Sequence, residues 1–194
     1  MSMLSELSPA EEHRYVAGRF LEVARAASPG DWDGPSPVDG WTARDVVGHL
    51  VDWFPGFLSA GAGVDLPEVP KVADDPVAAW SARMADIQAL LEDPGDRVVS
   101  NRHIGEVPLA PAIDQFYTAD VFMHTWDLAR ALGVEPDLDP ARCETVVAGS
   151  APFEDAMRSS GQFGPRFPVP DDASAQDKLA GFIGRNPSWR RPAR

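Results

Sequence analysis

Residues 111–133, PAIDQFYTADVFMHTWDLARALG, carry apolar side chains at helical spacing over their whole length. This spacing is typical of one long amphipathic helix. At about 1.5 Å per residue the helix would be roughly 33 Å long, which suits a helix bundle. Gly133 is a good residue to end it, because glycine readily adopts the left-handed conformation of a C-terminal cap. The expected inner face comprises Ile113, Tyr117, Asp120, His124, Leu128 and Ala131.

Three further stretches repeat the helical pattern, and loops rich in proline and glycine separate them. The first is expected to begin at the capping box Ser8-Pro9-Ala10-Glu11, the second after the N-cap Thr42, and the third at Asp75-Pro76. Within the second, Pro55-Gly56 is expected to kink or end the helix. Four amphipathic helices joined by loops of this length predict an all-α four-helix bundle.

Smaller elements are expected around this bundle. Residues 97–100 and 104–108 favour a short β-hairpin. Asp139-Pro140 is expected to start a further helix, and Asp172 to cap a short one carrying Leu179, Phe182 and Ile183. The tail 186–192 is expected to be irregular. There is no internal repeat and no second domain boundary, so we expect one domain over residues 1–194.

The composition restricts the classes of function. Apolar residues make up 44% and charged residues 24%, as in globular proteins, and no apolar run is long enough for a membrane span. The first residues lack the features of a secretory signal, so a cytoplasmic location is expected. A net charge of −13 argues against nucleic acid and anionic membranes as partners. Cys143 is the single cysteine, which excludes an internal disulfide; we expect it to be a half-buried helix residue.

Ionisable residues interrupt two of the apolar faces. His49 lies within the stripe of the second helix, and Asp120 and His124 are four residues apart on the fourth. Residues at this spacing point the same way, one helical turn apart. An unpaired ionisable group in a core costs several kcal/mol, so their inward placement calls for a partner.

A divalent metal ion would supply that partner. Two imidazoles and one carboxylate suit Zn²⁺, Ni²⁺, Fe²⁺ or Mn²⁺, and the ligand types do not distinguish these ions. Three protein ligands would leave positions open for water or substrate, as in catalytic sites. The residues alone leave two alternatives open: His49 as a hydrogen-bonded core residue, and Asp120 with His124 as an intrahelical pair.

Other polar residues near this cluster have several interpretations. Asp127 could compete as a ligand, accept a hydrogen bond from a ligating imidazole, pair with Arg130 or lie on the surface. Asp52 is equally ambiguous. Trp53 and Trp126 flank the proposed ligands and could line a pocket.

The two remaining histidines receive a simpler interpretation. His13 falls in a first helical turn and His103 in a loop. We expect both to be solvated.

The runs 41–50 (WTARDVVGHL) and 118–131 (TADVFMHTWDLARA) resemble the DinB-like superfamily. They look most like the N-terminal domain of mycothiol-dependent maleylpyruvate isomerases. The segments 168–173, 176–179 and 184–189 are similar to the ending of its small actinobacterial members. The resemblance implies an up-down-down-up bundle whose metal is held by His49, Asp120 and His124. It also implies thiol-dependent isomerases or transferases that use mycothiol, bacillithiol or glutathione.

Two departures from the isomerase make maleylpyruvate a doubtful substrate. We expect no additional C-terminal domain, and the acid ligand would be Asp120 where the isomerase has Glu. The leading hypothesis is a metal-dependent thiol enzyme, acting on a small electrophile with no catalytic group assigned beyond the metal. The alternatives are a metal-assisted hydrolase and a non-catalytic stress or scaffold protein. A homodimer is one option that the sequence leaves open.

Overall fold

Four long helices dominate the computed structural model, which describes residues 4–102 and 105–192. They are α1 (Pro9–Arg25), α2 (Ala43–Ala62), α3 (Pro76–Glu92) and α5 (Ala119–Leu132). The predicted all-α fold is therefore confirmed. Among the described residues, no helix is both long and apolar enough to cross a membrane.

The helix starts follow from capping residues that the sequence displays. In α1 and α2 the capping box is complete, because Ser8 and Thr42 accept from the third backbone N–H while Glu11 and Asp45 accept from the cap. Asp75 caps α3 by accepting from the N–H of Ala78 at 2.9 Å. Each such cap stabilises a helix by about 1 kcal/mol.

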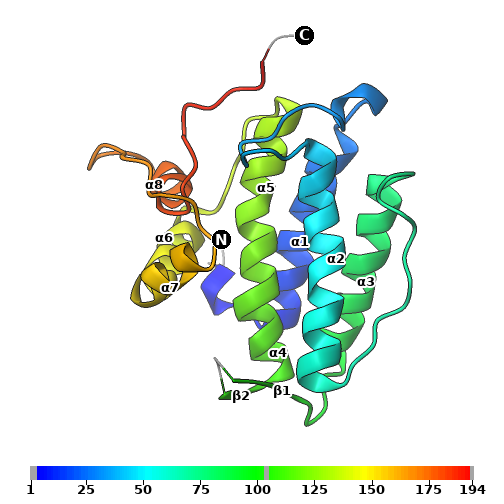
Figure 1. Cartoon of the computed structure of the whole chain (residues 1–194). Coiled ribbons are helices and arrows are strands. Elements are labelled where there is room, and N and C mark those ends of the chain that lie inside the picture. The colour runs from blue at the N-terminus through cyan, green and yellow to red at the C-terminus, as the bar shows by residue number, and fades with distance from the viewer. Residues whose placement is uncertain (1–3, 103–104, 193–194) are drawn as a thin grey trace.

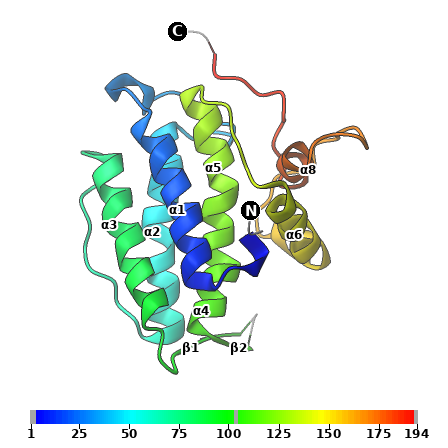
Figure 2. The same cartoon turned by 180° about the vertical axis from the view of Figure 1, so that it is seen from behind.

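The four helices run up, down, down and up in chain order (Figures 1 and 2). Helix α1 packs against α3 and α5, and α2 packs against the same two helices, so the bundle is a closed ring. Since α2 and α3 run in the same direction, the loop 63–75 travels the length of the bundle to connect them (Figure 1). This arrangement puts α2 and α5, the helices that carry the predicted ligands, side by side.

Helix α2 does not end at Pro55 but continues to Ala62, where Gly63 caps it in the left-handed conformation (φ 62°). Pro55-Gly56 was expected to kink or end the helix, and of these two outcomes the end was wrong. Proline has no N–H to donate to the carbonyl four residues earlier, which is that of Val51. Arg83 of α3 donates its Nε–H to this carbonyl at 3.2 Å, so packing against α3 satisfies the freed oxygen.

The helix predicted over residues 111–132 begins slightly earlier and is not uniform. α4 (Leu109–Ala112) continues through a π-helical segment, η3 (Ile113–Thr118), into α5. The N–H of Ala119 donates to the carbonyl of Asp114, five residues back, as a π turn requires. The expected inner face is otherwise as predicted, since all its members are buried except Asp120, which is partly exposed. Gly133 ends α5 with φ 73°.

The hairpin is present as β1 (Val98–Asn101) paired antiparallel with β2 (Gly105–Pro108). It closes the lower end of the bundle in Figure 1. His103 and residue 104 lie outside the described residues, so the expectation for His103 is not addressed.

The C-terminal third lies beside α5 (Figure 1). It contains α6 (Pro140–Ser150), capped by Asp139 as predicted, α7 (Glu154–Ser159), which was not predicted, and α8 (Ala175–Phe182). Ser174 caps α8 in place of the expected Asp172, because its hydroxyl accepts from the N–H of Asp177. Short 3₁₀ turns are η1 (Leu4–Glu6), η2 (Pro29–Asp31) and η4 (Ala151–Phe153). The tail to residue 192 is irregular, as expected.

His13 is buried, which corrects the expectation that it is solvated. Its Nδ1 lies 2.8 Å from Oε1 of Gln88 on α3, and its ring faces that of Tyr117 at 6.3 Å. The first turn of α1 is covered because α3 and the π-helical segment pack over it.

Glu12, the neighbour of His13, is also buried, at 3% exposure. Its Oε1 lies 2.7 Å from Nε of Arg142 on α6, and Arg142 approaches Asp114 at 3.8 Å. Burial raises the pKa of Glu12 to about 7, reinforced by the Asp114 carboxylate and opposed by Arg142. In the folded state Glu12 therefore stays protonated up to near-neutral pH.

We predict that Glu12→Gln changes the pH dependence of stability. A folded pKa above the unfolded value stabilises at low pH, and this contribution is lost as pH rises from about 4.5 through 7. The wild type loses on the order of 2–3 kcal/mol over this range, whereas the glutamine of the variant has no proton to lose. Denaturant unfolding at pH 5 and pH 8 should show the variant gaining stability relative to the wild type as pH rises.

Glu11→Gln is the matched control. The hydrogen bonds from Ser8 lower the pKa of Glu11, so its contribution is present at neutral pH and is lost as pH falls. Between pH 5 and pH 8 the stability of Glu11→Gln relative to the wild type should therefore stay nearly constant, whereas that of Glu12→Gln should rise. Equal slopes would contradict the assignment of Glu12.

Candidate metal centre

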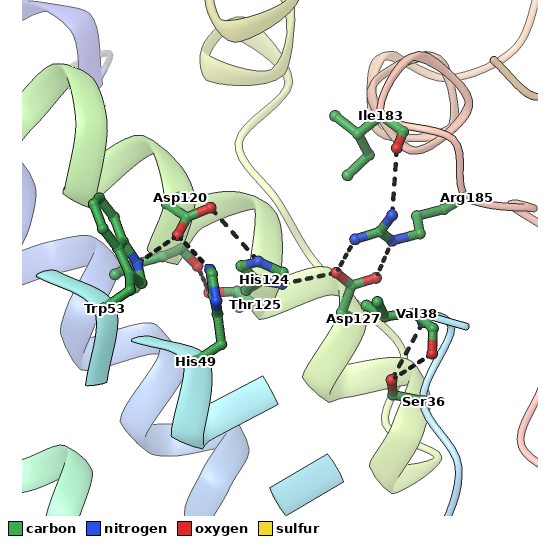
Figure 3. A network of polar contacts seen from close by, with 11 residues as sticks. Ser36, Val38, His49, Trp53, Asp120, His124, Thr125, Asp127, Ile183 and Arg185 are labelled. Atoms are coloured by element: carbon green, nitrogen blue, oxygen red, sulfur yellow. Dashed lines mark hydrogen bonds and ion pairs between the residues drawn. The ribbon is translucent and has the colours of Figure 1, made fainter. Parts of the chain in front are cut away.

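His49 reaches the interior between α2 and α5 from near the start of α2 (Figure 3). Its neighbours Val46 and Leu50 have no exposed surface, so they anchor the helix in the core. The His49 side chain keeps 31% of its surface exposed. It is thus held by a rigid helix and is still accessible from one side.

Asp120 and His124 face His49 from α5, one turn apart (Figure 3). The Asp120 carboxylate lies between the two imidazoles, with Oδ2 at 3.1 Å from Nε2 of His49 and Oδ1 at 3.5 Å from Nε2 of His124. The structure therefore brings together the three residues that the sequence singled out.

One donor atom from each of these residues can be chosen so that all lie within 4.8 Å of one another. Atoms that bind a common ion at about 2.1 Å are roughly 3–4.4 Å apart, so only a small inward movement is needed. Two imidazole nitrogens and a carboxylate oxygen suit a borderline divalent cation. Within residues 4–102 and 105–192, no other group of three His, Cys, Asp or Glu residues meets this criterion.

Trp53, one turn after His49 on α2, fixes the carboxylate. Its indole Nε1–H donates to Oδ2 of Asp120 at 3.0 Å. The indole and the imidazole of His49 thus approach the same oxygen, which holds the carboxyl group between the helices. The sequence had suggested Trp53 as a residue that could line a pocket, and the hydrogen bond is a more specific role.

His124 is oriented from behind by Asp127. Nδ1 of His124 lies 2.9 Å from Oδ2 of Asp127, whose side chain is fully buried. Since a carboxylate only accepts, Nδ1 carries a proton; in the neutral imidazole the lone pair is then on Nε2, the nitrogen that faces Asp120. Arg185 donates to both carboxylate oxygens of Asp127, at 2.9 and 3.1 Å. Arg130, the other partner considered for Asp127, pairs with Glu135 instead.

The electrostatics follow from burial and these contacts. Burial lowers the pKa of His124, but the carboxylates of Asp120 and Asp127 outweigh it and raise the pKa above its ordinary value. Burial raises the pKa of Asp127, but Arg185 and His124 outweigh it and keep the pKa below the usual range. Asp127 is therefore a carboxylate when it holds His124.

One tryptophan, Trp41, lies directly beside the cluster. The ring of Trp41 lies 5.1 Å from that of His49 and 5.8 Å from that of His124, centroid to centroid. Trp41 and Trp189 of the C-terminal tail also line a hollow of about 590 Å³, together with the loop from Asp33 to Thr42. Trp126, by contrast, is 1% exposed and belongs to the core, so it lines no pocket at the cluster.

Three residues near the cluster were left ambiguous or missed by sequence reasoning. Asp52 is exposed on α2 and is not a member of the group of three candidate ligands. Trp41 stands directly before the N-cap Thr42, where no helical spacing indicates its direction. Arg185 is distant in sequence from its partner Asp127, so no local pattern predicts their contact. The sequence singled out Arg185 only as part of the segment 184–189.

Residues 13–129 match the family model of the mycothiol maleylpyruvate isomerase N-terminal domain. The chain belongs to this family. The match contains His49, Asp120, His124 and Asp127, and it confirms the resemblance seen in the sequence. It ends before α6, so Arg185 lies outside it.

Curated relatives of this family member include two uncharacterized proteins from two strains of Mycobacterium tuberculosis. Each is 31% identical over 183 residues, covering 92% of this chain and 98% of the relative. The similarity therefore includes the C-terminal third. No solved structure matches the chain significantly.

We predict that His49→Ala and His124→Ala each abolish retention of a divalent ion. Both remove a nitrogen donor from a three-residue set, and the two that remain do not hold a borderline ion tightly. The measurement is elemental analysis after purification without added metal, followed by loading and dialysis, with circular dichroism to check folding.

Asp52→Asn provides the control, because it removes a carboxylate from the same helix without touching the cluster. It should retain metal like the wild type. Full retention in both histidine variants would show that the three residues are not the ligands.

Proposed function

We propose that this protein is a divalent-metal-dependent thiol enzyme, which transfers a low-molecular-weight thiol to an electrophilic small molecule or isomerises such a molecule. The observation that carries the proposal is the convergence of His49, Asp120 and His124 within 4.8 Å, with one side open. Family membership adds support, since the family takes its description from a mycothiol-dependent isomerase.

The three residues would hold the ion and leave coordination positions for a small ligand. When bound, a divalent cation lowers the pKa of a coordinated thiol and so supplies a nucleophilic sulfur at neutral pH. The protein's own residues prepare the site for this. Asp127 holds Nδ1 of His124 and so directs Nε2 inward, and Trp53 fixes the carboxylate of Asp120.

Cys143 does not compete as the nucleophile. It is fully buried in α6, more deeply than the sequence suggested, and burial raises its pKa to about 12. A buried thiol at neutral pH is unreactive. A thiol reaction at the cluster would therefore need a sulfur brought by a second small molecule such as mycothiol, bacillithiol or glutathione.

The hollow beside Trp41 suggests the character of the electrophile. Among the described residues, its lining includes Asp33, which pairs with Arg44 at 3.2 Å, and Asp39, and it includes no lysine or arginine. Such a surface offers no cation to a dicarboxylate and suits neutral molecules with a flat apolar part that can lie against indole rings. Together with Asp120 at the position where the isomerase has Glu, this argues against maleylpyruvate as the substrate.

The proposal predicts turnover that requires both a metal and a thiol. Purified metal-loaded protein would be assayed with mycothiol, bacillithiol and glutathione against epoxides, halogenated aromatics and α,β-unsaturated carbonyl compounds. Conjugation or isomerisation should fall to the uncatalysed level after chelation and in His124→Ala. It should persist in Cys143→Ala, the control for the protein's own thiol.

Other outcomes separate the competing functions. Turnover that needs metal but no thiol would indicate a hydrolase acting through bound water. No turnover with any thiol, together with a melting temperature that falls sharply on chelation, would indicate an ion that only braces the bundle.

A further inference from the structure

After α8 the chain turns back toward the bundle. Arg185 on this segment contacts Asp127, the residue that holds the imidazole of His124 (Figure 3). Gly184 makes this return possible. It has φ 88°, and a Cβ at this position would lie 2.6 Å from the backbone of Gly164. Glycine is thus required both by conformation and by space, and the residue that follows, Arg185, points into the interface with α5.

Arg185 is 9% exposed and its guanidinium is directed at one carboxylate. Nε donates to Oδ1 of Asp127 at 2.9 Å and Nη2 donates to Oδ2 at 3.1 Å, which is a bidentate pair. Nη1 donates to the carbonyl of Ile183 at 3.3 Å. All three nitrogens of the guanidinium therefore donate hydrogen bonds, which fixes its orientation.

Oδ2 of Asp127 has two partners, Nη2 of Arg185 and Nδ1 of His124. An ion pair that served only to attach the C-terminal segment to α5 would not need to involve Oδ2, the oxygen that also holds the imidazole of His124. Without Arg185, the fully buried Asp127 would be an uncompensated carboxylate, which is strongly unfavourable. Its carboxylate would then turn to other donors, and its hold on Nδ1 would weaken.

We propose that Arg185 is a positioning residue of the metal centre, acting through Asp127 to fix the tautomer and orientation of His124. This inference rests on the metal centre proposed above. It makes the C-terminal segment part of that centre, although the segment lies outside the family match. Residues behind a ligating histidine typically affect metal affinity by about 10–100-fold.

The test is a competition titration with a chromophoric chelator, using Zn²⁺ as the probe. Arg185→Gln should bind Zn²⁺ about 10–100-fold more weakly than the wild type. Arg185→Lys should fall between the two, since an ammonium keeps the charge but cannot make the bidentate pair. Asp127→Asn should lose a similar factor, and the double variant should lose little more, because both changes break one chain of contacts.

Arg191→Gln is the matched control in the same segment. Arg191 pairs with Asp31 at 2.8 Å and does not contact Asp127. It should lower the melting temperature at most, with Zn²⁺ affinity close to that of the wild type. Equal loss of affinity in Arg191→Gln and Arg185→Gln would overturn the proposal, because it would mean that docking of the tail matters and the contact to Asp127 does not.

The His124 ring gives a readout that needs no metal. In ¹⁵N–¹H spectra of the metal-free wild type, the ring proton should be on Nδ1, and Arg185→Gln should lose this protected signal while Arg191→Gln retains it. If the wild type binds no Zn²⁺ but shows this pattern, the metal centre is wrong and the action of Arg185 on His124 is right. An unchanged Nδ1–H signal in folded Arg185→Gln and Arg185→Lys would refute the positioning role itself.

Discussion

Much of this structure depends on the contacts of one buried side chain, the carboxylate of Asp127. It is fully shielded from solvent, so it must be neutralised by the protein, and it is shared between His124 on its own helix and Arg185 from the end of the chain. One side chain thus joins the bundle, the C-terminal third and the cluster of candidate metal ligands. Apolar contacts between these parts would tolerate sliding, whereas this one has a fixed geometry.

The bundle was predictable because its determinants are local. Capping residues such as Ser8 and Thr42 mark helix starts, and the spacing of apolar residues marks the buried face. The three candidate ligands were predictable for the same reason, since they break these faces at helical spacing. Sequence periodicity has this power only inside a regular helix.

Features that depend on contacts between distant segments were not predictable. His13 is buried because α3 covers it, and Pro55 is tolerated because Arg83 of α3 takes over the carbonyl it leaves free. The pairing of Asp127 with Arg185 belongs to the same class, as does the place of Trp41 beside both imidazoles. The π-helical segment is a further case, because an i to i−5 bond leaves no mark in the pattern of apolar residues.

The return of the chain to Asp127 also has a meaning for the order in which the protein is made. All four bundle helices are synthesised by Leu132, yet the guanidinium that neutralises Asp127 is added only with Arg185. At roughly 5–20 residues per second, several seconds pass between these events on the ribosome. A nascent bundle would therefore hold the His124 imidazole incompletely until the segment that carries Arg185 has been added.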